Sequence, residues 1–82
     1  MMDNENEPNL VRGEVPTTEL ALFLDKVMVM KSTEFCEIKI RKDVKSGMCK
    51  LALNFEEKSW MSVFMYQFKD GMLSRWARYF IK

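Results

Sequence analysis

The most concentrated chemical feature of this sequence is a group of basic residues within one short segment. Between positions 39 and 50 there are five cations and one acid, Asp43. The cations are Lys39, Arg41, Lys42, Lys45 and Lys50. Side chains this close together produce a patch of positive potential. Phosphate groups bound to such a patch release counterions, which gives affinity that does not depend on base sequence. The segment therefore predicts nucleic-acid binding, and the alternative is a solvated, charged face of a half-exposed sheet.

Residues 75–82 interleave cations with aromatic rings. In sites for single-stranded nucleic acid, rings stack on bases while cations contact phosphates. Trp, Tyr and Arg also anchor many protein interfaces, and Trp76 and Phe80 are apolar enough to pack inside a core. All three interpretations stay open at this point. We count Arg75 and Arg78 among the nucleic-acid candidates, and Trp76 and Tyr79 among the interface candidates.

Aromatic residues repeat at every fourth position after residue 56, which is the spacing of one helix face. Two methionines widen this apolar stripe, which consists of Trp60, Met61, Phe64, Met65 and Phe68. A domain this small has difficulty burying so wide a stripe alone. We therefore expect a homodimer that buries the stripe, and packing within the core of one chain is the alternative.

Residues that do catalytic work are scarce. The sequence has no histidine, the side chain that most often transfers protons near neutral pH. Its three glycines are isolated, so neither a dinucleotide-binding nor a phosphate-binding glycine loop is present. Two cysteines are too few for a four-thiolate zinc site. These absences predict a non-enzymatic protein that uses no cofactor and no metal.

The elements that must position these residues include a hairpin. Between residues 36 and 42, the apolar Cys36, Ile38 and Ile40 alternate with charged side chains, and residues 48–55 alternate in the same way. This period of two predicts antiparallel strands with one apolar and one charged face. The turn at 43–47 ends in a glycine that can adopt a positive φ. Cys36 and Cys49 would share the apolar face, where we expect buried free thiols.

The ends of the chain are less regular. Residues 1–14 carry four acids against one arginine, and we expect a disordered acidic tail there and a single small domain over 15–82. The apolar spacing favours a helix over 17–26, and the β-branched residues that follow favour a strand. Residues 72–82 fit either a short helix or a strand.

The composition is that of one globular domain, with 82 residues, 48% of them hydrophobic and 30% charged, and a net charge of +1. No apolar run approaches the roughly 18 residues that a membrane span requires, and the acidic start does not resemble a secretory signal. We expect a cytoplasmic protein, or a nuclear one if its source is a eukaryote.

Residues 37–42 and 51–60 resemble part of a known DNA-binding domain. The first segment reads Glu-Ile-Lys-Ile-Arg-Lys, and the second reads Leu-Ala-Leu-Asn-Phe-Glu-Glu-Lys-Ser-Trp. A strand, a basic turn, a strand and a long helix follow one another in this way in positive-cofactor-four-type transcription coactivators, whose dimers offer a curved sheet to single-stranded DNA. The resemblance implies that Trp60 packs the helix onto the sheet. It also implies phosphate contacts by Lys39, Arg41, Lys45 and Lys50.

The sequence therefore predicts an α+β fold, with an antiparallel β-hairpin or three-stranded sheet and an amphipathic helix packed on one face. We expect a non-enzymatic module that binds single-stranded DNA or RNA through its basic hairpin face. The alternative is a small interaction protein, an inhibitor or adaptor of a larger complex, that docks through its C-terminal aromatic and Arg residues. Neither function involves a membrane.

Overall fold

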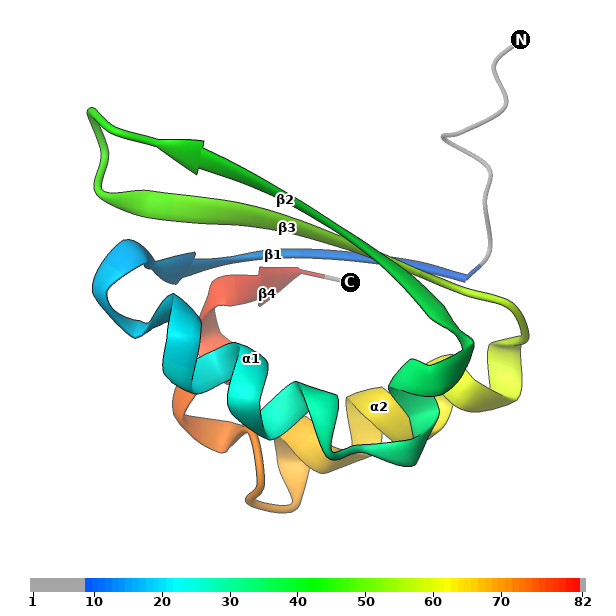
Figure 1. Ribbon diagram of the computed structural model, residues 1–82. Helices are drawn as coiled ribbons and strands as arrows, with labels where there is room; N and C mark the ends of the chain where they lie inside the picture. The colour runs from blue at the N-terminus through cyan, green and yellow to red at the C-terminus, as the bar shows by residue number, and fades with distance from the viewer. Residues whose placement is uncertain (1–8, 82) are drawn as a thin grey trace, which may run out of the picture.

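The computed structural model describes residues 9–81, which form a sheet with helices on one side (Figure 1). The longer elements are β1 (Leu10–Pro16), α1 (Leu20–Met28), β2 (Cys36–Asp43), β3 (Met48–Phe55) and α2 (Lys58–Lys69), followed by the short strand β4 (Phe80–Ile81). Single 3-10 segments precede α1, β2 and β4, namely η2 (Thr17–Glu19), η3 (Lys31–Phe35) and η4 (Ser74–Tyr79). No helix or loop of the described residues covers the other side of the sheet, which we call the open side.

The four strands form one sheet in the order β2-β3-β1-β4, and each neighbouring pair is antiparallel. β1 and β2 therefore run parallel with β3 between them, and β3 and β4 run parallel with β1 between them. Such interleaved β-α-β units define the ferredoxin-like arrangement. The α+β class predicted from the sequence is confirmed, and the sheet gains a short fourth strand.

The predicted hairpin is present and has the predicted faces. Strands β2 and β3 pair from Cys36 opposite Phe55 to Asp43 opposite Met48. The alternate residues of β3 that are buried in the core are Cys49, Leu51, Leu53 and Phe55. The residues between them therefore point to the open side. The turn closes where expected, because Gly47 has a φ of 73° and its N–H donates to the Asp43 carbonyl at 3.0 Å.

The core lies between the sheet and the helices, and aromatic rings fill much of it. Phe23 of α1 meets Trp76 of η4 edge to face, with ring centroids 5.1 Å apart. Phe64 and Phe68 of α2 are in edge contact at the same centroid distance, 5.1 Å. All four rings are buried. The sheet and η4 together cover apolar side chains of the helices that would be exposed on an isolated helix.

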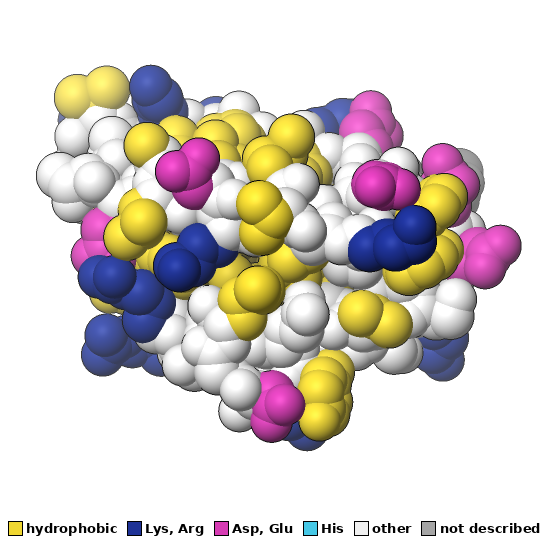
Figure 2. Space-filling view, turned by 60° about the horizontal axis from the view of Figure 1, so that its bottom comes forward, with side chains coloured by type: hydrophobic (Ala, Val, Ile, Leu, Met, Phe, Trp, Pro, Cys, Tyr) yellow, Lys and Arg dark blue, Asp and Glu magenta, His cyan; other side chains and the backbone are white. Residues whose placement is uncertain are grey.

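This packing contradicts the reason for expecting a dimer interface on α2, which was that one chain could hardly bury the apolar stripe alone. Phe64 and Phe68 are inside the core of one chain, and Trp60, Met61 and Met65 are half-buried against its edge. The apolar side chains that remain exposed on the helical side are scattered (Figure 2). They lie on both helices, on the segments after them and on β2: Leu22, Met28, Val29, Val63, Tyr66, Met72 and Ile40.

Strand β1 departs from the sequence-based expectation, which placed residues 1–14 in a tail. Residues 10–14 of that segment pair with β3 in the middle of the sheet. Val11 and Val15 are buried, whereas Arg12 and Glu14 point to the open side. The charges of this segment therefore lie on the solvent face of a strand. Residues 1–8 of the expected tail lie outside the described residues.

Two other segments also differ from expectation. Residues 27–28, expected to begin a strand, continue α1, because Val27 is needed on the buried face of that helix. The chain after Met28 then forms a turn and the 3-10 segment η3 in place of a strand. At the C-terminal end, where the sequence fits either a short helix or a strand, both are present, since η4 is followed directly by β4.

Gly13 allows the edge strand β4 to pack onto β1. A methyl group at this position would overlap the ring of Phe80. That ring cannot move away freely, because it stacks on Phe23 at 5.6 Å and contacts Phe68 at 4.8 Å between centroids. The absence of a side chain at Gly13 is therefore part of the packing.

We predict that Gly13→Ala lowers the free energy of unfolding by about 1–3 kcal/mol, which is the usual cost of overpacking a core. Urea denaturation followed by circular dichroism measures the change. In a Phe80→Ala background the added methyl group should cost much less, since its obstacle is gone. An equal cost in both backgrounds would contradict the packing explanation.

Candidate nucleic-acid interface

The open side of the sheet brings together charged side chains from three neighbouring strands. Across β1, β3 and β2, the strand register forms one row from Arg12, Ala52 and Lys39. The next row consists of Glu14, Lys50 and Arg41. Neighbouring strands lie about 4.8 Å apart, and alternate residues of one strand about 6.7 Å apart. The four cations therefore occupy a small area, about 10 Å wide and 7 Å long.

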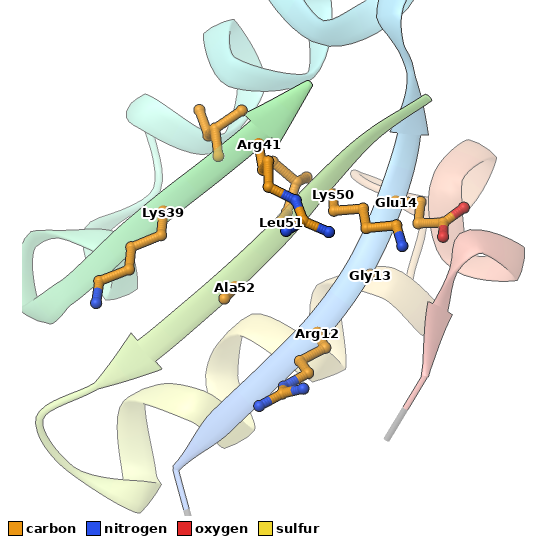
Figure 3. Close-up of a pocket in the computed structure, with 9 residues that line it drawn as sticks. Arg12, Gly13, Glu14, Lys39, Arg41, Lys50, Leu51 and Ala52 are labelled. Carbon is orange, nitrogen blue, oxygen red and sulfur yellow. The ribbon is translucent and has the colours of Figure 1, made fainter. Parts of the chain in front are cut away.

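These side chains surround a shallow groove of about 460 Å³ (Figure 3). Its charged lining consists of one acid, Glu14, and four cations: Arg12, Lys39, Arg41 and Lys50. Four positive charges and one negative charge give the groove a net formal charge of +3. The floor is low because Ala52, between the longer side chains, has a small side chain. We call this surface the basic groove.

The described residues neutralise the cations of the basic groove poorly. Arg41 and Lys50 are directly opposite each other, and like charges in that position destabilise an antiparallel pair. Lys50 extends toward Glu14 in Figure 3, so the one acid of the groove balances part of this charge. Among residues 9–81, the ion pair that forms lies elsewhere, between Arg75 and Glu19 at 3.2 Å. A bound anion would therefore reduce repulsion within the groove.

Three of the five hairpin cations predicted to bind nucleic acid line this groove, and two do not. Lys42 is opposite Cys49 in the register, so its side chain starts on the helical side of the sheet. Lys45 lies in the turn between β2 and β3, past the end of the paired strands. Proximity in sequence grouped all five residues, but the alternation of a strand separates neighbours.

The C-terminal candidates lie away from the basic groove. Arg75 and Arg78 belong to η4, which is on the helical side of the sheet (Figure 1). Trp76 is fully buried, and its indole N–H donates to Glu19 Oε1 at 3.0 Å. Tyr79 is half-buried, with the guanidinium of Arg78 lying 5.4 Å from its ring centroid. The C-terminal run thus contributes mainly to the core and its rim.

Arg12 is the groove residue that sequence reasoning missed. The excess of acids over residues 1–14 assigned it to a tail. The alternation of Val11 and Val15 with charged residues and Gly13 was an available signal for a strand. That signal is only five residues long, and Gly13 weakens it because glycine is unfavourable within strands.

The open side lacks aromatic side chains within the described strands. Around the basic groove, the residues that the register directs to this side are Leu10, Arg12, Glu14, Glu37, Lys39, Arg41, Lys50, Ala52 and Asn54. RNA-binding four-stranded sheets stack bases on aromatic rings of this face. The basic groove has no such rings, so its chemistry is the binding of anionic groups by guanidinium and ammonium donors.

No protein-family model, curated protein or solved structure matches this chain. In the part of the chain that the structure describes, no helix has the length and apolar content needed to cross a bilayer. The same residues contain no group of three or more Cys, Asp or Glu side chains placed to hold a metal ion. Function must therefore be inferred from the geometry of this chain.

The two cysteines lie at opposite ends of the hairpin, since Cys36 is opposite Phe55 and Cys49 is opposite Lys42. This separation precludes a disulfide between them, and both are free thiols. Cys49 is buried as expected, whereas Cys36 is half-buried. Burial raises the pKa of the Cys36 thiol from 9.0 to about 11, against a smaller opposing effect of a backbone hydrogen bond from Asn54.

We predict that Cys36 is alkylated about 100-fold more slowly in the folded protein than in the unfolded chain below pH 9, because the folded thiol forms less thiolate. Mass spectrometry after timed iodoacetamide treatment, with and without denaturant, measures the ratio. The raised pKa also implies that the contribution of this thiol to stability is constant below pH 9 and is lost as the pH rises toward 11. Equal alkylation rates in both states would contradict this assignment.

Proposed function

We propose that this protein is a non-enzymatic module that binds the phosphate backbone of single-stranded nucleic acid across the open side of its sheet. The observation that carries this proposal is the convergence of four cations from three strands on the basic groove. Arg12 is distant in sequence from Lys39, Arg41 and Lys50, so the fold itself creates the cluster. A charged strand kept only for solubility does not require such convergence.

The chemistry of the groove suits phosphate. The guanidinium groups of Arg12 and Arg41 can each donate two hydrogen bonds to one phosphate, while the lysines supply point charges. Binding would release counterions from the nucleic acid, which is the main source of affinity in such contacts. No ion pair among the described residues has to break to free these cations.

The size and lining of the groove favour a single strand without base preference. Among residues 9–81, no helix lies on the open side to enter a duplex groove, which is where base pairs are read. It also has no aromatic ring in its described strands for stacking on bases. Glu37 and Asp43 flank the cations on β2, so few phosphates would be held by one chain. We therefore expect modest affinity that depends strongly on salt.

The resemblance to positive-cofactor-four-type coactivators supports the same face of the sheet. It implies phosphate contacts by four residues, of which Lys39, Arg41 and Lys50 line the basic groove. The rival function, docking on a larger complex through the C-terminal aromatic residues, has less support. Trp76, its strongest anchor, is buried and already bonded to Glu19.

We predict that affinity for a labelled oligodeoxythymidylate falls with salt with a log–log slope of about −3, since each of four phosphate contacts contributes about 0.7 on a single strand. Fluorescence anisotropy over a salt series measures the slope. A duplex of the same length should bind more weakly. Weak binding that salt does not change would instead favour a protein partner.

We further predict that the triple variant Lys39→Glu/Arg41→Glu/Lys50→Glu loses this binding and keeps its fold, because these side chains point away from the core. The matched control reverses three exposed lysines of the helical side, Lys26, Lys58 and Lys69, and changes the net charge equally. The control should bind as the wild type does. Wild-type binding by the groove variant, with an unchanged circular dichroism spectrum, would end the nucleic-acid proposal.

A further inference from the structure

β2 is an edge strand with one unpaired side. It is eight residues long and pairs with β3 on one side, and no described strand lies on the other. The opposite edge strand, β4, has two residues. A long open edge carries a row of backbone N–H and C=O groups that can pair with another strand.

The ladder between β2 and β3 determines which backbone groups face the open edge. The N–H of Glu56 donates to the carbonyl of Phe35 at 2.8 Å, so these residues form a hydrogen-bonded pair. Such pairs alternate along an antiparallel ladder. The residues of β2 that bond to β3 are therefore Glu37, Lys39, Arg41 and Asp43. Those that direct N–H and C=O to the open edge are Cys36, Ile38, Ile40 and Lys42.

We propose that two copies of this chain pair antiparallel through their β2 strands, about a twofold axis at Lys39, and form one continuous sheet. Every outward-facing residue then has a partner in the other copy, Cys36 with Lys42 and Ile38 with Ile40. This register uses the whole edge between residues 36 and 42. The inference is independent of the proposed function, because it concerns the free protein.

Charge complementarity on the open side selects this register. Glu37 of each copy lies opposite Arg41 of the other, which gives two cross-strand pairs of opposite charge. Within one chain Arg41 has only the cation Lys50 opposite it, so the second copy supplies the acid on its free side. The two Lys39 residues meet at the axis, and this one like-charge contact opposes the two favourable pairs.

Neighbouring registers are less favourable. An axis at Ile40 would set Glu37 against Asp43 and Lys39 against Arg41, so that like charges meet in both charged pairs of the open side. An axis at Ile38 would pair Glu37 with Lys39 but would use only residues 36–40 of the strand. The axis at Lys39 is the one that combines the full edge with opposite charges.

The helical side of β2 also favours a second copy. Ile40 is 41% exposed although it lies on the face that should be buried, and Ile38 is only half-buried. In the proposed pairing Ile38 of each copy lies directly opposite Ile40 of the other, which gives two such contacts. Within the described part of the chain, β2 packs chiefly against β3 and η3.

Engineered cross-linking tests the register. In a Cys36→Ala background, Lys39→Cys brings two introduced thiols together at the axis, where Cα atoms are about 4.5 Å apart, a distance that a disulfide can span. Mild oxidation should then give a covalent dimer on a non-reducing gel. In the same background, the matched variant Glu37→Cys places its thiol opposite residue 41 of the other copy and should form no covalent dimer. Equal cross-linking of both variants, or of neither, would overturn the proposed pairing.

Light scattering on the full chain without nucleic acid tests the association itself. The wild type should have twice the monomer mass at micromolar concentrations. Glu37→Arg or Arg41→Glu alone should raise the dimer dissociation constant at least about tenfold, because each converts two attractive pairs into repulsive ones. The double variant should restore the dimer, and Glu34→Arg, just outside β2, should have no effect. A monomeric wild type, or a dimer that neither single reversal weakens, would overturn the proposal.

Discussion

The burial of one side of β3 beneath a layer of aromatic rings is the constraint on which the rest of this structure depends. β3 lies inside the sheet, between β2 and β1, and its residues Leu51, Leu53 and Phe55 are buried. Because strand side chains alternate, this burial commits Lys50 and Ala52 to the open side. A slip of one residue would exchange the two sets and put a lysine in the core. The basic groove therefore exists where it does because the core packs as it does.

The aromatic layer shows how so small a domain closes its core without a second copy covering α2. Phe64 and Phe68 pack from α2, and η4 returns the chain so that Trp76 reaches Phe23. The indole N–H of Trp76 donates to Glu19, which also forms an ion pair with Arg75. Burying an indole is costly unless its N–H has a partner. This contact explains why the C-terminal aromatic run serves the fold more than the surface.

Charge on the open side departs from what stability alone would favour. A sheet face selected only for stability would set acids opposite cations, yet Arg41 faces Lys50 on the neighbouring strand. Local conflicts of this kind are expected at functional or strained sites. The proposed phosphate contact and the proposed pairing through β2 each supply negative charge to this face, from a ligand in one case and from Glu37 of a second copy in the other.

The hairpin, its two faces, its turn and α2 could be predicted from the sequence, because their apolar residues repeat with the period of one element. The same local pattern placed Lys39, Arg41 and Lys50 together. It could not reveal that Arg12 joins them, since β1 reaches β3 only when the chain has folded back over some forty residues. Nor could it show whether Phe64, Phe68 and Trp76 face a partner or their own core. Periodicity states that a face is apolar, but the packing of distant segments decides what covers it.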